Sequence, residues 1–296
     1  MTPDYSDATM YATREAEQTD RVRDDVVTRH ISNRAGLPHG RTLYCGMRFV
    51  RLLFCASALF SAHCSHNGIP CVAMNQPDSV SMPKGFTYVD TLIPTLRTNL
   101  KYAGSDNFVG RPLNGYRGRR AILRAEAAEA LKNAAADLAR QGYGIVIYDA
   151  YRPHTAMQDI TAWGRDAADR KMKARYYPNI DKERVFGDAY VHNFSEHSRG
   201  VAVDLSLYHL NGGRPVDMGG WHDLLDPSSA TDSCLVTAVQ RRRRTVLKKA
   251  MESHGFKNYA PEWWHYRLDP EPDATAHFYF PIWDGMADAP KAGTQP

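Results

Sequence analysis

A chain of 296 residues can bury a full hydrophobic core, and at about 100 to 200 residues per domain it forms one large domain or two small ones. Its 37 Lys and Arg against 33 Asp and Glu leave a formal net charge of +4, so nothing in the overall charge points to nucleic acid. The five cysteines include no Cys-x-x-Cys pair, which argues against a cysteine-rich structural metal site.

The N-terminal region carries the pattern of an export signal, but not at the start of the chain. Residues 1–42 are polar and lack apolar periodicity, which predicts no stable fold. Residues 47–66 read MRFVRLLFCASALFSAHCSH, a Met and two arginines, then the apolar stretch 52–60, then small residues. This order is typical of a secretory signal peptide, and the apolar stretch is too short for a membrane span, which needs about 20 residues.

We therefore predict a signal peptide at 47–66, translation from Met47 and export to the periplasm. Residues 1–46 would be an over-extended gene model or a disordered leader. The alternative is a buried or frayed helix after a polar tail, which would leave the protein cytoplasmic. Three prolines among Asn, Ser and Gly predict a linker at 67–85, before a folded domain at 86–285 and a tail at 286–296.

Within the domain, helix and strand patterns alternate. Residues 87–92 (TYVDTL) are strand-like, and residues 119–142 are Ala- and Leu-rich with helical spacing and a closing Gly. Residues 144–153 (GIVIYDAYRP) fit a buried strand that leaves into a loop. The pattern predicts an α+β fold, with a small mixed or antiparallel sheet, helices packed around it and a functional site on the open sheet face.

Two later segments refine this prediction. Residues 201–207 (VAVDLSL) alternate, so one strand face is core and the other, which carries Asp204, faces a site. Residues 234–255 indicate a helix that ends at Gly255 and contains four arginines at 241–244. We interpret these arginines as the solvated face of the helix, with a nucleic-acid patch as the alternative.

A metal site is the hypothesis that best joins the polar residues. His197 and Asp204 are separated by Gly200, which allows a tight turn that folds the His back beside the Asp. His265 would be the third ligand, and two His with one carboxylate and an open fourth position match catalytic zinc sites. Each residue alone is more often a hydrogen-bonded core residue, but the joint pattern SxHxxGxAxD followed by ExWH is far more specific.

Glu262 precedes His265 by three residues and is the candidate general base. A glutamate beside zinc-bound water can take its proton, since the metal lowers the pKa of that water to about 7. Residues three apart on an ideal strand point to opposite faces. The hypothesis therefore requires a bend at Pro261 or a helical or bulged turn.

These motifs resemble the D-alanyl-D-alanine dipeptidases, zinc enzymes that include the vancomycin-resistance dipeptidases, within the lysostaphin-like, D-alanyl-D-alanine and hedgehog-like metallopeptidases. The similarity runs from about Phe86 to Trp283 and is carried by KYAGSDNFVGRPLNGY (101–116), YDAYRP (148–153), YYPNID (176–181), SEHSRGVAVDLSLY (195–208) and MESHGFKNYAPEWWHYRL (251–268).

The resemblance implies a role for each candidate residue. It implies one zinc ion per chain with the ligands His197, Asp204 and His265. It implies that Glu262 is the general base and that Arg152 steadies the oxyanion, as a guanidinium can, with a salt bridge as the alternative for Arg152.

Recognition of the substrate is implied for three further residues. Tyr102 and Asp223 would hold the free ammonium group of a dipeptide, and Ser195 matches a residue whose neighbourhood contacts substrate. Residues 221–230 (WHDLLDPSSA) depart from the family pattern, because they lack its phenylalanine before the Asp and its acidic-Arg-Ser-His ending. The sequence therefore leaves open whether longer peptides are accepted.

The function so implied is zinc-dependent hydrolysis of D-alanyl-D-alanine, in cell-wall precursor turnover or glycopeptide resistance. The partner would be this small dipeptide, with no nucleic acid and no stable membrane span, and the oligomeric state is not indicated. One alternative is a peptidoglycan D,D-carboxypeptidase or endopeptidase with a more open pocket. Another is a non-catalytic zinc-binding or cell-wall-binding module, against which Glu262 and Arg152 stand.

Overall fold

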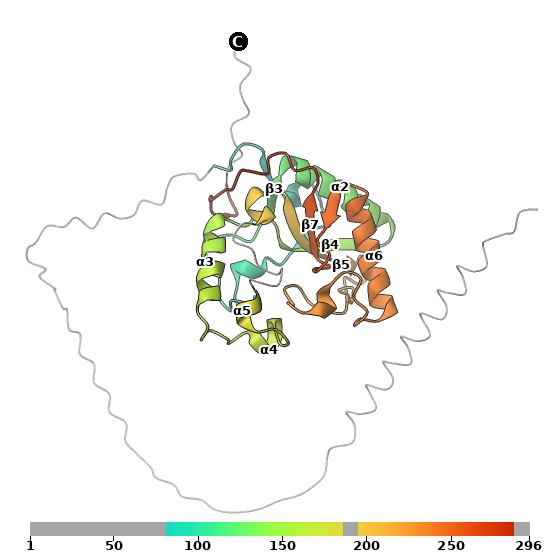
Figure 1. The fold of residues 1–296 in the computed structure, drawn as a ribbon. Coiled ribbons are helices and arrows are strands. Elements are labelled where there is room, and N and C mark those ends of the chain that lie inside the picture. The colour runs from blue at the N-terminus through green and yellow to red at the C-terminus, as the bar shows by residue number, and fades with distance from the viewer. Residues whose placement is uncertain (1–80, 186–194, 287–296) are drawn as a thin grey trace, which may run out of the picture. The chain divides into compact units, whose positions relative to one another are not determined.

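The computed structural model describes residues 81–185 and 195–286 (Figure 1). The predicted leader, the signal peptide, most of the linker and nearly all of the tail lie outside these residues, so those assignments stay predictions. Within the described ranges, no helix combines the length and the apolar character needed to cross a membrane.

A mixed sheet forms the centre of the described fold, as the sequence predicts. Its strands lie in the order β2-β4-β5-β7-β6, and all neighbours are antiparallel except β2 and β4. A second, two-stranded sheet pairs β1 with β3. The bounds are β1 Phe86–Tyr88, β2 Arg97–Thr98, β3 Ile122–Arg124, β4 Tyr143–Asp149, β5 Ala202–His209, β6 Phe256–Asn258 and β7 His265–Leu268.

Two long helices, α2 (Ala125–Arg140) and α6 (Ala238–Glu252), pack against each other and against the sheet (Figure 1). The buried stripe of α2 is mostly alanine, which lets the helix lie close to its neighbours. A capping box of Thr237 and Gln240 starts α6 by satisfying its first backbone N–H groups. The helix α3 (His154–Arg165) lies on the opposite side of the sheet (Figure 1).

Shorter helices complete the described chain. They are the α-helices α4 (Lys173–Tyr176) and α5 (Lys182–Val185) and the 3-10 helices η1 (Val89–Thr91), η2 (Lys101–Ala103), η3 (Glu196–Arg199) and η4 (Pro227–Ser229). Of these, η2 and η3 carry residues of the site.

Three predicted elements are shorter than expected. The helix predicted at 234–255 spans only Ala238–Glu252. The helix predicted at 119–142 begins only at Ala125, because Ile122–Arg124 pair with β1 instead, and Ile122 and Leu123 are almost fully buried there. The strand predicted at 87–92 ends at Tyr88, where the chain turns into η1. At the start of α2, a pairing between distant segments overrides the local pattern.

The interpretation of the four arginines as a solvated face is wrong for Arg244. Arg242 is exposed, whereas Arg244 is completely buried. The reason is its position, three residues before Leu247 and seven before Met251, which are also buried. Arg244 therefore lies on the inward stripe of α6 and not on its outer face.

Candidate metal centre

Three elements bring the predicted metal ligands together. His197 lies in η3, Asp204 lies in β5 and His265 begins β7, whose register places His265 directly across from Asp204. Gly200 ends η3 with a φ of 73° and turns the chain into β5. A Cβ at this position would lie 2.4 Å from the ring of Phe86, so both the backbone angle and the space require glycine.

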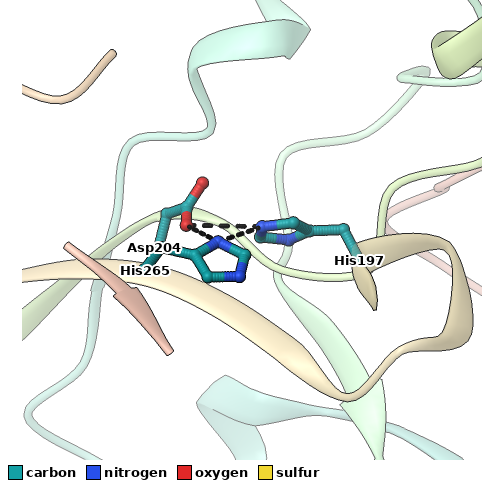
Figure 2. A group of neighbouring side chains, drawn as sticks. All are labelled: His197, Asp204 and His265. Atoms are coloured by element: carbon teal, nitrogen blue, oxygen red, sulfur yellow. Dashed lines mark hydrogen bonds and ion pairs between the residues drawn. The ribbon is translucent and has the colours of Figure 1, made fainter. Parts of the chain in front are cut away.

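The ligand atoms form a compact triangle (Figure 2). His265 Nδ1 lies 3.0 Å from Asp204 Oδ1, and His197 Nε2 lies 3.3 Å from the same oxygen and 3.2 Å from His265 Nδ1. All three residues are buried. Ligands bound at about 2.0–2.1 Å at the corners of a tetrahedron are roughly 3.3 Å apart, so this donor set fits zinc.

The hydrogen bonding of His197 also fits a metal. Its Nδ1 lies 2.7 Å from the carbonyl oxygen of Ala150, which can only accept, so Nδ1 carries the proton and Nε2 has a free lone pair. That lone pair faces the Asp204 carboxylate, an arrangement that a shared cation stabilises. Metal-bound histidines usually donate their second ring N–H to a carbonyl or carboxylate in this way.

A tight turn brings Glu262 and His265, which are three residues apart, to the same side of the chain. The backbone N–H of His265 donates to the carbonyl of Glu262 at 3.2 Å, so the chain turns between the two and both side chains reach the same cavity. Burial, followed by the negative charges of Asp204 and Asp223, raises the pKa of Glu262 well above its usual range. Such a carboxylate is a stronger base than one in water.

Arg152 makes the salt bridge that was its alternative role, and it lines the cavity as well. Its Nε donates to Asp149 Oδ2 at 2.8 Å, and its Nη2 lies 2.8 Å from the same oxygen. Nη2 is also 3.9 Å from Asp204 Oδ2. Asp149 accepts a further hydrogen bond from Tyr116, at 2.5 Å. Asp149 is therefore a site residue that sequence reasoning missed, although an acid closing an apolar strand was a signal for it.

Tyr102 and Asp223 meet although 121 positions separate them. The Tyr102 hydroxyl in η2 donates to Asp223 Oδ2 at 2.9 Å, and the two residues are only 1% and 5% exposed. Asp223 has a φ of 63°, and it is the only described residue other than glycine with a positive φ. Burial raises the pKa of Asp223.

His222 is a second residue that sequence reasoning missed. Its Nε2 lies 3.1 Å from Asp204 Oδ2 and 3.4 Å from Asp223 Oδ1, and the residue is buried. It thus joins the carboxylate of the metal triad to the carboxylate beside Tyr102. The signal was present in the sequence, because His222 stands where the family pattern has phenylalanine.

Ser195 has a structural contact in addition to its place at the cavity. It is the N-cap of η3, and its hydroxyl accepts a hydrogen bond from the backbone N–H of His197 at 3.3 Å. This contact helps to orient the segment that carries the first metal ligand.

All eight site residues predicted from the sequence line one cavity of about 290 Å³. Its apolar walls come from Phe108, Met157, Ile160 and Leu225. The volume is at the lower end of small-ligand pockets, which are about 300–1,000 Å³. The arrangement can hold a metal ion, a base and a small polar ligand at the same time.

A buried His-Asp-His set beside a glutamate of raised pKa defines the site of a metallopeptidase. The chain belongs to the D-ala-D-ala dipeptidase family, whose model matches residues 82–282. It is 41% identical over 201 residues to the D-alanyl-D-alanine dipeptidase of Streptomyces coelicolor, covering 68% of this chain and 100% of that protein. The corresponding protein of Enterococcus faecium is 40% identical over 203 residues, again covering 68% and 100%.

A more distant relative is the D-alanyl-D-alanine dipeptidase of Escherichia coli. It is 32% identical over 177 residues, which are 60% of this chain and 81% of that protein. The family is one of zinc metallopeptidases, and the buried group of His197, Asp204 and His265 could bind this metal.

Proposed function

We propose that the protein hydrolyses the dipeptide D-alanyl-D-alanine to two molecules of D-alanine. The observation that carries the proposal is the buried pair of Asp223 and Tyr102 in the same cavity as the metal triad and Glu262. A carboxylate and a phenol that are shielded from water form a receptor for an ammonium group at a fixed distance from the reacting centre. Relatives that the chain matches over their whole length are D-alanyl-D-alanine dipeptidases.

The chemistry can be assigned to residues of this chain. His197, Asp204 and His265 would hold the zinc ion, which would supply Lewis-acid chemistry at the attacking water and the scissile carbonyl. Glu262 takes the proton from the attacking water on its carboxylate and passes it to the amine nitrogen of the departing D-alanine. Glu262 lines the same cavity as the three candidate ligands, so one carboxylate can accept the proton and then release it.

Arg152 would stabilise the negative charge that develops on the carbonyl oxygen. Asp149 holds its guanidinium through Nε and Nη2, so the orientation is set before substrate arrives. A donor that is fixed in advance stabilises a transition state without the cost of reorganisation.

The buried end of the cavity favours a dipeptidase over a carboxypeptidase. In a longer stem peptide, the group that meets Asp223 would be a neutral amide and not an ammonium. The buried carboxylate would then lose the charge pairing that an ammonium provides, which costs about 2–5 kcal/mol. Asp223 and Tyr102 are also too deeply buried to lie beside an extended peptide in solvent.

The test compares two substrates with the purified, zinc-loaded full chain. We expect D-alanine to be released from D-alanyl-D-alanine and little from its N-acetylated form. Equal cleavage of both would replace the dipeptidase proposal by a peptidoglycan D,D-carboxypeptidase. Bound zinc without cleavage of either would indicate a binding module.

We also propose that the protein acts outside the cytoplasm, in cell-wall precursor turnover or glycopeptide resistance. The support is the order of residue types at 47–66. Sequencing the N-terminus of the protein from a periplasmic fraction tests this, since cleavage near residue 66 is expected. Recovery of the uncleaved chain from the cytoplasm would contradict it.

A further inference from the structure

The segment 218–230 carries His222 and Asp223 but has little regular structure of its own. Its only helix is the short η4, and Asp223 sits in the left-handed region with a φ of 63°. Backbone of this kind is held in one conformation only when the surroundings fix it.

Arg244 of α6 binds both ends of the loop. Its Nε donates to the carbonyl of Met218 at 2.7 Å, and its Nη1 donates to the carbonyls of Ser228 and Ala230 at 2.9 and 2.8 Å. One rigid guanidinium thus joins the first residue of the loop to its last turn. Three hydrogen bonds from one planar group fix direction as well as distance.

The environment of Arg244 is unusual for a charged residue. It is completely buried, and among the residues that the structure describes no carboxylate lies within ion-pair distance of it. Burial lowers the pKa of Arg244 to about 10. A buried charge is retained where its hydrogen bonds offset the loss of water. Here the three loop carbonyls accept from Nε and Nη1, while Nη2 is buried with no hydrogen-bond partner among the described residues.

The same region is tied to the turn that carries Glu262. The backbone N–H of Trp263 donates to the carbonyl of Ser229 at 3.0 Å, and that of Thr231 donates to the carbonyl of Ala260 at 2.9 Å. The guanidinium of Arg244 lies 5.7 Å from the ring centre of Trp263. Arg244 therefore lies where the loop 218–230 contacts the turn that carries Glu262.

We propose that Arg244 is a positioning residue for substrate recognition, which holds the loop 218–230 in the conformation that places Asp223 against the ammonium of the dipeptide. The inference rests on the proposed function, because it names what sets the specificity of that same site. Arg244 itself lines no part of the cavity and acts through Asp223.

The first experiment compares kcat and KM of Arg244→Met, Arg244→Lys and the matched control Arg242→Met, whose side chain is exposed on the same helix. We expect Arg244→Met to raise KM for D-alanyl-D-alanine at least tenfold, with a smaller change in kcat and unchanged zinc content. Arg244→Lys keeps the charge and part of the hydrogen bonding, so its KM should lie between that of Arg244→Met and that of wild type. The control should match wild type.

A double-mutant cycle with Asp223→Asn separates positioning from general destabilisation. If Arg244 acts through Asp223, the double variant should have the KM of Asp223→Asn alone. Effects that multiply would overturn the proposal. If Arg244→Met does not fold, the same cycle is run with Arg244→Lys.

Hydrogen exchange in the substrate-free protein tests the inference without activity. The amides of 218–230 should exchange at least tenfold faster in Arg244→Lys than in the Arg242→Met control, while those of β5 stay protected. Equal exchange in the loop would overturn the proposal. A wild-type protein that cleaves no D-alanyl-D-alanine would refute the function, and the exchange result would still decide whether Arg244 fixes the loop.

Discussion

The two sides of the cavity are built from different kinds of backbone. Asp204 and His265 lie on paired strands, so the sheet register sets their distance. Asp223 and His222 lie on an irregular loop, whose two ends are joined by the hydrogen bonds of Arg244. The difference shows how one fold can keep its chemistry constant while its recognition changes, because the loop can be altered without moving the strands.

The largest effect is expected on the strand side. His197→Ala should lose zinc and with it all measurable release of D-alanine, because two ligands do not make a catalytic zinc site. Metal content and activity are measured on the same sample. His209→Ala is the control, a histidine on β5 that does not line the cavity. Stoichiometric zinc in His197→Ala would show that the triad is not the metal site.

Glu262→Gln should keep zinc and lose about 10²- to 10⁴-fold in kcat, the usual contribution of a general base. The amide preserves shape but cannot accept the proton. Single-turnover kinetics with D-alanyl-D-alanine measure the effect. A variant with near wild-type turnover would transfer the role of base to another residue.

On the loop side, Asp223→Asn should reduce kcat/KM for D-alanyl-D-alanine about 100-fold, since losing one partner of a buried charge pair costs about 2–5 kcal/mol. Slow cleavage of the N-acetylated peptide should change far less. Competition between the two substrates gives the ratio directly. An equal loss for both would mean that Asp223 is structural.

His222→Phe tests the link between the two sides. It removes a hydrogen bond to Asp204, and we expect zinc affinity to fall about tenfold, within the range for residues that support metal ligands. Titration against a chelator measures the dissociation constant. His222→Gln, which can still donate, should recover part of the affinity. An unchanged zinc dissociation constant in both variants would show that the loop does not influence the metal site on the strands.

The smallest effect is expected at Asp159 of α3, a partly buried carboxylate that accepts hydrogen bonds from Arg111 and from the backbone N–H of Asn114. The hydrogen bond from Arg111 holds the pKa of Asp159 below its ordinary value. A lowered folded pKa stabilises the protein above the unfolded value, near pH 4, and this stabilisation is lost as pH falls further. Asp159→Asn should therefore cost about 0.5–1 kcal/mol at pH 7.

Chemical denaturation at pH 7 and pH 3 measures this difference, with Asp232→Asn as a control at an exposed carboxylate. The difference between wild type and Asp159→Asn should shrink at the lower pH. A constant difference would mean that the charge of Asp159 does not stabilise the fold.

The sequence was most informative where spacing is local. The metal ligands and Glu262 stand in short motifs on or beside strands, and the structure brings these residues together. The proximity of Tyr102 and Asp223 followed only from the family resemblance, because no periodic pattern relates residues 121 positions apart.

Arg244 and β3 could not be found from the sequence for a physical reason. The burial of Arg244 is offset by backbone carbonyls of an irregular loop. Every residue type has a backbone carbonyl, so the sequence does not indicate which ones accept these hydrogen bonds. The strand β3 exists because β1 pairs with it, while its own residues continue a helical pattern. Local patterns do not encode contacts of this kind.

The backbone angle of Asp223 also limits how this position can evolve. Asparagine and glycine tolerate left-handed backbone best, and each is one nucleotide away from an aspartate codon. Asparagine would remove the charge and keep the turn, so a single point mutation could abolish the demand for a free amino group without unfolding the loop. The shortest mutational path from a dipeptidase towards an enzyme that trims longer peptides therefore passes through this one codon.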